Sequence, residues 1–162
     1  CVLKYRKMAG FMSKLSKTHL DVWRLFITAH SRLINKIDTD LQAAGQIPLN
    51  WYDVLIELDE APDKRLRMAE LADKVVLSRS GLTRLVDKLE KADLLTREID
   101  PDDRRGFYAI ITEKGQTALH HAWEIYRDSI VTQFASFFSL EEARMMQEIF
   151  TKMIEYQKTN KK

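Results

Sequence analysis

The period at which apolar residues recur changes after Asp93, and this change restricts the fold more than any other feature of the chain. Before Asp93, apolar residues recur at steps of three and four, as on one face of an amphipathic helix. After it, segments 95–99 and 107–112 are rich in β-branched and aromatic residues, and the sequence between them, DPDDRRG at 100–106, has the composition of a turn. We therefore expect a β-hairpin within an otherwise helical chain.

Four helices are predicted before the hairpin. They span residues 17–44, about 50–61, 66–74 and a segment that opens at Ser78. Gly45 ends the first helix, Asn50 is a plausible N-cap for the second, and Pro62 closes the second. The third and fourth helices are joined by a tight turn through residues 75–77. In the fourth, Ser78 can cap the backbone amides, and a stripe of apolar residues faces the core. The stripe consists of Leu82, Leu85, Val86 and Leu89.

Two long helices are predicted after the hairpin. Thr112 can cap the first, whose apolar pattern runs for about six turns and includes Phe134 and Phe137. The sequence SLEE at 139–142 has the spacing of a capping box and opens the last helix. We expect the lysine-rich segment 158–162 to fray.

The expected fold class is mainly α with a small β-hairpin wing: a winged helix-turn-helix domain with long dimerisation helices. We expect five divisions: an N-terminal extension or tag-like segment (1–16, with Met12 as a candidate natural start), a first dimerisation helix (17–48), a winged DNA-binding lobe (49–115), C-terminal dimerisation helices (116–158) and a tail (159–162). The first and last two helices carry more apolar surface than one subunit needs, which suggests an interface between two subunits. Some of their aromatic residues are nevertheless expected to fill the core of one subunit.

Several classes of function are disfavoured by composition. No apolar stretch approaches the roughly 20 residues of a membrane span, and no signal peptide is recognisable at the start. Cys1 is the sole cysteine, so no cysteine zinc cluster is expected and a reducing cytoplasm fits. His19 and His30 lie three helical turns apart, too far to share one metal ion. Because no phosphate loop, nucleophile motif or metal-ligand spacing is recognisable, we expect neither an enzyme nor a cofactor.

The helix that opens at Ser78 and the hairpin are the predicted DNA-reading elements. A helix of this kind fits a major groove about 12 Å wide, and arginines at the hairpin tip suit an adjacent minor groove. The predicted contact residues are Ser78, Arg79, Ser80, Gly81, Thr83, Arg84 and Lys88 on the helix, and Asp103, Arg104 and Arg105 on the hairpin. Asp103 is expected to orient Arg105 by a charge-assisted hydrogen bond.

The charge balance leaves two other interpretations open. Net charge is +2, and residues 64–105 contain 11 Lys or Arg against 9 Asp or Glu, so a basic face depends on which way the acids point. The helix charges alone also suit an ordinary solvated face. The alternative function is a winged-helix module that binds protein rather than DNA. Arginines on both the helix and the hairpin tip favour DNA.

Three segments make the chain resemble the MarR family of bacterial transcription regulators: LADKVVLSRSGLTRLVDKLE at 71–90, DPDDRRG at 100–106 and ITEKG at 111–115. The resemblance covers Lys17 to about Tyr156. It implies that five helix residues enter the major groove, namely Ser78, Arg79, Ser80, Thr83 and Arg84. It also implies that Asp103 and Arg105 act in the wing and that the protein is a homodimer through the first and last two helices. Two positions depart from the family's frequent glycines: Val76 in the turn and Asp93 at the end of the recognition helix. Asp tolerates the left-handed conformation better than Val.

The resemblance also implies a small-molecule effector. A candidate pocket for a small aromatic or other organic molecule consists of His19, Trp23, Arg24, His30 and Trp51, although aromatic residues at helical spacing more often belong to a core. We do not expect sensing through a thiol, because no cysteine follows Cys1. We expect a cytoplasmic repressor of a bacterial or archaeal cell that binds pseudo-palindromic double-stranded DNA as a homodimer.

Overall fold

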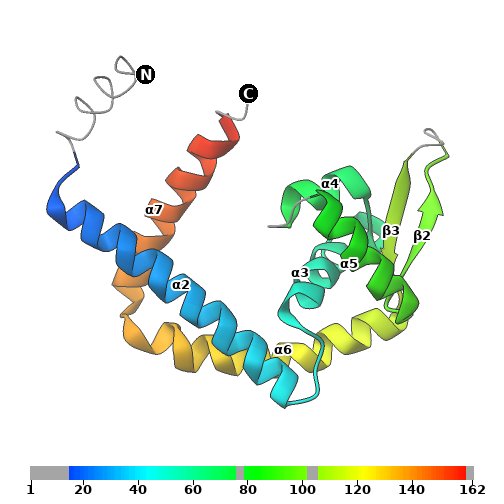
Figure 1. Cartoon of the computed structure of the whole chain (residues 1–162), viewed down its shortest axis with the longest axis horizontal. Helices are drawn as coiled ribbons and strands as arrows, with labels where there is room; N and C mark the ends of the chain where they lie inside the picture. The colour runs from blue at the N-terminus through cyan, green and yellow to red at the C-terminus, as the bar shows by residue number, and fades with distance from the viewer. Residues whose placement is uncertain (1–14, 76–78, 102–105, 160–162) are drawn as a thin grey trace. The chain divides into compact units, whose positions relative to one another are not determined.

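The structure, a computed structural model, describes residues 15–75, 79–101 and 106–159, and the chain divides after Lys36 into two compact units. Figure 1 labels the elements. The helices are α2 (Lys17–Ala43), α3 (Leu49–Asp59), α4 (Met68–Lys74), α5 (Arg79–Lys91), α6 (Glu113–Gln133) and α7 (Leu140–Thr159). The strands are β1 (Arg65–Arg67), β2 (Leu95–Ile99) and β3 (Phe107–Ile111). Short 3-10 helices span Pro62–Lys64 and Ala135–Phe137.

The first unit consists of the N-terminal part of α2. Its start at Lys17 agrees with the prediction, and the Ser16 hydroxyl accepts the backbone N–H of His19 at 3.2 Å, as an N-cap does. Most of its large apolar side chains, such as Trp23 and Leu25, are exposed in the single chain. The helix ends as predicted, because Gly45 adopts the left-handed conformation that closes many helices (φ 69°).

The predicted N-cap of the next helix is wrong. Helix α3 begins at Leu49, so Asn50 lies inside its first turn, and Pro48 occupies the cap position without a side-chain hydrogen bond. The missing acceptor is supplied by Asp38, whose Oδ1 accepts the backbone N–H of Leu49 at 2.9 Å. A residue of α2 thus performs the capping that we had assigned to Asn50.

The third predicted helix is too long at its start. Residues 65–67 form strand β1, and α4 begins only at Met68. The strand pairs antiparallel with β3, and its burial alternates, since Leu66 is buried between the exposed Arg65 and Arg67. The backbone N–H of Arg67 donates to the Glu70 carboxylate at 3.0 Å, which closes the first turn of α4.

The predicted hairpin is confirmed. Strands β2 and β3 pair antiparallel from Leu95 opposite Ile111 to Ile99 opposite Phe107. With β1 they form a three-stranded sheet of order β1-β3-β2, and the hairpin projects beside α5 (Figure 1). The sheet therefore has one strand more than the sequence predicted.

Helix α5 packs as predicted and ends at the predicted place. The stripe of Leu82, Leu85, Val86 and Leu89 is buried. Asp93 adopts φ 59°, and the backbone N–H of Leu94 reaches the carbonyl of Leu89 at 3.0 Å, as in a Schellman motif. The expectation that Asp93 takes the left-handed conformation of the family's glycine is confirmed. The turn at Val76 and the cap Ser78 lie outside the described residues.

The two C-terminal helices are confirmed with corrected ends. The hydroxyl of Thr112 accepts the N–H of Gly115 at 3.0 Å, the predicted cap of α6. Helix α6 ends at Gln133, so Phe134 and Phe137 lie beyond it, and Phe137 ends a 3-10 turn. The predicted capping box of α7 is present, since Ser139 and Glu142 exchange backbone-to-side-chain hydrogen bonds. Helix α7 extends through Thr159, and the rest of the segment that we expected to fray lies outside the described residues.

Candidate nucleic-acid interface

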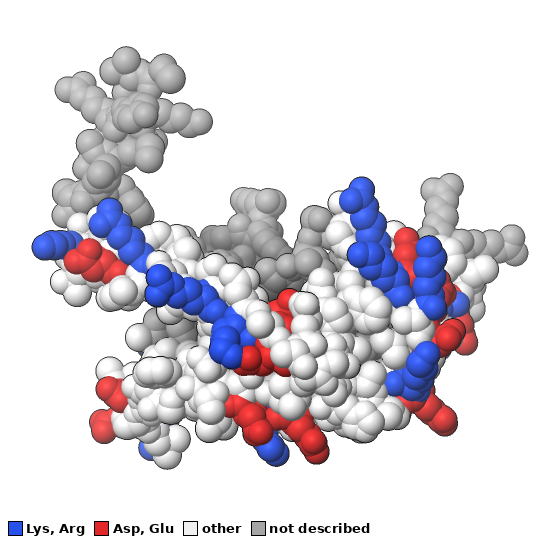
Figure 2. Space-filling model, turned by 60° about the horizontal axis from the view of Figure 1, so that its bottom comes forward, with Lys and Arg blue, Asp and Glu red and all other residues white. Residues whose placement is uncertain are grey.

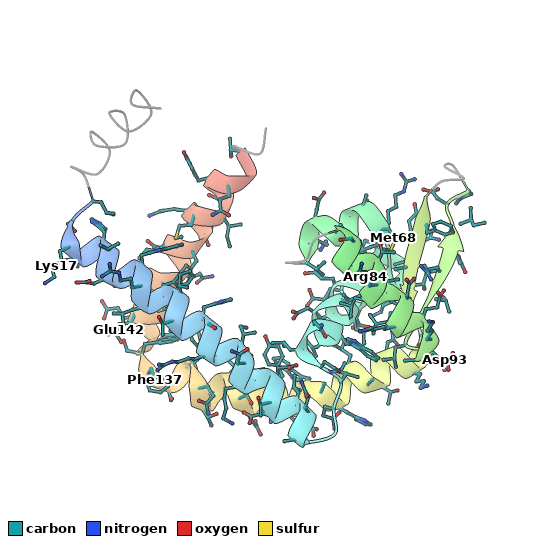
Figure 3. The ribbon with its side chains drawn as sticks, in the orientation of Figure 1. Lys17, Met68, Arg84, Asp93, Phe137 and Glu142 are labelled. Carbon is teal, nitrogen blue, oxygen red and sulfur yellow. The ribbon has the colours of Figure 1, made fainter. Side chains whose placement is uncertain are left out.

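Helix α5 presents a polar surface opposite its buried stripe. Ser80, Thr83, Arg84 and Lys88 are exposed, and Gly81 is half-buried. Figure 3 shows Arg84 on α5, with Asp93 at the C-terminal end of the helix. Arg79 is the first helical residue. The structure thus describes the side chains of five of the seven predicted helix residues, all on α5. Of the other two, Arg79 is described by its backbone alone, and Ser78 lies outside the described residues.

The acidic residues of α5 are neutralised by one arginine. Arg97 of β2 contacts Asp87 at 2.8 Å, and it donates two hydrogen bonds to the carboxylate of Glu90, that from Nε at 3.0 Å. This contact holds the pKa of Glu90 below its usual range. The two acidic residues of α5, Asp87 and Glu90, are therefore paired with Arg97, whereas Arg84 and Lys88 are exposed.

Positive and negative side chains are nevertheless interspersed on one face of the molecule. On the face that Figure 2 presents, Lys and Arg lie next to Asp and Glu rather than in one basic patch. This face therefore carries no single basic patch.

A buried carboxylate anchors the base of the hairpin loop. Asp100 is 1% exposed, and its carboxylate lies 2.8 Å from Nη2 of Arg67. Its backbone N–H donates to the carbonyl of Gly106 at 3.0 Å, across the neck of the loop. The same arginine donates from Nε to the Tyr108 hydroxyl at 2.9 Å, and these contacts raise its pKa further. Arg67 of strand β1 therefore contacts a residue on each side of the hairpin loop, Asp100 before it and Tyr108 after it.

Sequence reasoning missed this anchor. We assigned Arg67 to the first turn of a helix and treated Asp100 only as a turn residue. The available signal was the alternation of Arg65, Leu66 and Arg67, which fits an edge strand. Arg65 also lies over the ring of Tyr108, with its guanidinium carbon 4.9 Å from the ring centroid. Asp103, Arg104 and Arg105 lie outside the described residues, so their predicted contacts stay predictions.

The end of α5 is joined directly to the start of α6. Thr112 donates from its hydroxyl to the carbonyl of Asp93 at 2.7 Å, and its N–H reaches the carbonyl of Leu94 at 3.1 Å. Lys114 adds a hydrogen bond to the carbonyl of Ala92 at 2.8 Å. This joint fixes the C-terminal end of the candidate recognition helix on α6.

The predicted effector pocket is not tested by the structure. His19, Trp23, Arg24 and His30 are exposed residues of the first unit, and Trp51 is a half-buried residue of the second. A different cavity of about 580 Å³ lies within the second unit. Its lining includes Tyr52, Asp53 and Ile56 of α3 and His120, Trp123 and Tyr126 of α6. Among the described residues, no cluster of three or more His, Cys, Asp or Glu side chains could hold a metal ion.

Comparison with known proteins identifies the family. The sequence model of the MarR family matches residues 46–106. The crystal structure of Sco3205, a MarR family transcriptional regulator from Streptomyces coelicolor determined in complex with DNA, is 33% identical, with a TM-score of 0.81 over 87% of this chain and 89% of that chain. The chain belongs to the MarR family.

Two further relatives agree with this membership. The crystal structure of AbsC, a MarR family transcriptional regulator from Streptomyces coelicolor, is 27% identical, with a TM-score of 0.82 over 90% of this chain and 98% of that chain. MhqR, an HTH-type transcriptional regulator from Bacillus subtilis, is 35% identical over 88 residues, which are 53% of this chain and 59% of MhqR. The matched region thus spans less than two thirds of MhqR.

Family membership confirms the resemblance stated from the three sequence segments and the winged-helix fold class. MarR family proteins are transcription regulators rather than enzymes, which agrees with the class expected from the sequence. No helix among the described residues is long and apolar enough to cross a membrane.

Proposed function

We propose that this protein is a homodimeric transcription regulator that binds double-stranded DNA in a sequence-specific manner, with α5 in the major groove and the β2–β3 hairpin against the adjacent minor groove. Two observations together carry the proposal. Helix α5 has an exposed polar face, and the base of the hairpin beside it is held by the ion pair between Arg67 and Asp100. Sco3205, at 33% identity over 87% of the chain, was crystallised with DNA, which supports the same activity here.

The proposed contacts divide by role. We assign Arg84 and Lys88 to contacts with phosphates or base edges, to which Ser80 and Thr83 would add hydroxyl groups. Arg79 and Gly81 lie in the first turn of α5, where a glycine lets the backbone approach the duplex, and Ser78 stays the proposed cap before them. Arg104 and Arg105 would read the minor groove, with Asp103 orienting Arg105. Arg65 of β1 is a further candidate for a phosphate contact, because it is exposed on the same sheet.

The dimer follows from the apolar surface of α2 and α7. Single-chain exposure is 53% for Ile149, 60% for Met145 and 42% for Met153, which recur every four residues along α7. Such a stripe on one helix is typical of an interface between subunits. Two copies of α5 spaced about 34 Å apart would match half-sites one helical turn apart, so we expect a pseudo-palindromic site.

Repression is the action that we assign to this binding. A dimer that covers two successive half-sites in a promoter blocks that stretch of duplex sterically. We place this activity in the cytoplasm, where the DNA of a bacterium or archaeon lies, and we expect a small organic effector to release it.

Replacing Arg84 with alanine should weaken DNA binding about 10-fold or more, because one charged contact to phosphate or base is lost. The slope of log affinity against log salt should also become shallower by about one unit if the contact is to phosphate. Fluorescence anisotropy with a labelled duplex, measured at several salt concentrations, provides both values.

Arg127→Ala is the matched control. It also removes one positive charge, but from α6, where Arg127 contacts its neighbour Asp128 at 3.0 Å. It should bind DNA nearly as wild type does. Equal affinities for the Arg84 variant and wild type, with circular dichroism unchanged, would contradict the assignment of α5 to the groove. The same comparison with Arg105→Ala tests the wing.

A further inference from the structure

The face of the hairpin that packs on the core continues toward the loop beyond its buried part. Opposed residues of β2 and β3 form successive rows across this face, which are Leu95 with Ile111, Arg97 with Ala109, and Ile99 with Phe107. The first row and Ala109 are buried, whereas Ile99 is 62% exposed and Phe107 is 42% exposed. The row nearest the loop therefore presents two large apolar side chains to solvent in the single chain.

These two residues, which we call the apolar pair, form one continuous patch. The backbone N–H of Asp100 donates to the carbonyl of Gly106 at 3.0 Å, so residues 100 and 106 are a hydrogen-bonded pair of the ladder. Ile99 and Phe107 are then the neighbouring pair without hydrogen bonds, in which opposed side chains lie closest. Single exposed apolar residues are common on protein surfaces, but an adjacent pair of this size indicates a contact surface.

The apolar pair borders the candidate DNA interface. Arg97, two residues before Ile99 and on the same face of β2, contacts Asp87 of α5 at 2.8 Å. Side chains two residues apart on a strand are separated by about 7 Å, so Ile99 lies one such step from this contact toward the loop. Its acidic neighbour Glu98 belongs to the opposite face, where it pairs with Tyr108. The apolar pair thus lies on the α5 side of the hairpin, which runs beside α5 in Figure 1.

The proposed docking on DNA places a specific part of the duplex at this position. With α5 in the major groove and the hairpin loop in the adjacent minor groove, the ends of β2 and β3 cross the sugar–phosphate strand that separates the two grooves. Phosphates on that strand attract Arg and Lys, whereas the deoxyribose rings between them offer C–H surface. Two apolar side chains suit the sugars and not the phosphates.

We propose that the apolar pair packs against deoxyribose rings of the DNA strand between the two grooves. The proposal rests on the proposed function, because it names the part of the duplex that this surface contacts. Burial of apolar surface favours association without neutralising a phosphate, so it releases no counterion. The contact should therefore add affinity without adding to the salt dependence of binding.

The double variant Ile99→Thr, Phe107→Thr tests this expectation. Threonine suits a β-strand as well as the residues that it replaces, but it removes most of the apolar surface. With a duplex selected by the wild-type protein from a randomised library, the affinity should fall about 10-fold or more. The slope of log affinity against log salt should stay at the wild-type value, whereas a lost phosphate contact would make it shallower.

Two control variants separate the apolar contact from other effects. Val131→Thr makes a similar change at an exposed position of α6, outside the sheet, and should bind DNA as wild type does. Phe107→Leu keeps an apolar side chain and should retain most of the affinity. If the double variant binds as tightly as Val131→Thr, the proposal is overturned. A double variant that light scattering shows to be monomeric would assign the pair to a subunit interface and would also overturn it.

Footprinting on the DNA identifies the contacted groups. Hydroxyl radicals attack deoxyribose, and dimethyl sulfate methylates guanine N7 in the major groove. At saturating concentration, the wild-type protein should protect sugars beside each half-site, and the double variant should lose that protection but keep the protection of N7. Unchanged protection of the sugars would overturn this proposal alone. A wild-type protein that protects neither group and binds no duplex would overturn the proposed function, on which the sugar contact depends.

Discussion

Gly115→Ala is expected to destabilise the second unit severely. A Cβ built on Gly115 would lie 2.0 Å from the carbonyl oxygen of Leu94 and 2.8 Å from Cγ1 of Ile111. The carbonyl belongs to the backbone at the joint between α5 and α6, so it cannot rotate away as a side chain would. Overpacking of this kind costs about 3 kcal/mol or more. Urea unfolding followed by circular dichroism measures the loss.

Gly45→Ala separates this steric effect from the general effect of replacing a glycine. Gly45 has φ 69° and no atom within 4 Å of its added Cβ, so alanine there meets only the backbone penalty of the left-handed conformation. That penalty is about 1 kcal/mol. If Gly115→Ala is no less stable than Gly45→Ala, the close contact of α6 with Leu94 is not a constraint on the fold.

Ile149→Asp is expected to dissociate the homodimer. Ile149 is the central member of the exposed stripe on α7, between Met145 and Met153. A carboxylate buried in an apolar interface lacks a partner and costs several kcal/mol. Because two linked lobes bind a duplex about 100-fold or more tightly than one, DNA affinity should fall by a similar factor. Light scattering after size-exclusion chromatography gives the mass, and anisotropy gives the affinity.

Gln147→Asp is the matched control on the same helix. Gln147 is exposed and lies about 200° around α7 from Ile149, so the new carboxylate should remain in water. This variant should stay dimeric and bind DNA like wild type. A dimeric Ile149→Asp protein with wild-type affinity would show that another surface joins the subunits.

Local chemistry was sufficient to predict most of the lobe. The β-branched and aromatic residues of 95–99 and 107–112, with a turn between them, predict the hairpin, and the apolar stripe of α5 predicts which side of that helix is buried. The end of α5 was also predictable, because Asp93 tolerates the left-handed conformation that a C-terminal cap needs.

The errors share a physical cause, namely contacts between residues far apart in the sequence. Three residues of β1 cannot form a strand alone, and their hydrogen bonds come from β3, more than 40 residues later. The N-terminal amide of α3 is bound by Asp38, on the preceding helix, rather than by the adjacent Asn50. Neither partner can be recognised from local propensity.

The same limit applies to the candidate sites. Asp100 looked like a turn residue, and only the tertiary structure brings it to Arg67 as the anchor of the wing. The cavity between α3 and α6 joins Tyr52 and Asp53 to Trp123 and Tyr126, two groups about 70 residues apart. Their aromatic character was visible in the sequence, but their juxtaposition was not.

Selection of bound duplexes from a randomised library tests the central claim most directly. Wild-type protein at physiological salt should enrich one motif with two inverted half-sites whose centres lie about 10 base pairs, or an integral number of helical turns, apart. Ile149→Asp should lose that enrichment. Failure of the wild-type dimer to enrich any sequence, or enrichment of a single unrepeated motif that the monomeric variant binds equally well, would contradict a symmetric dimer that reads DNA with α5 and its wing.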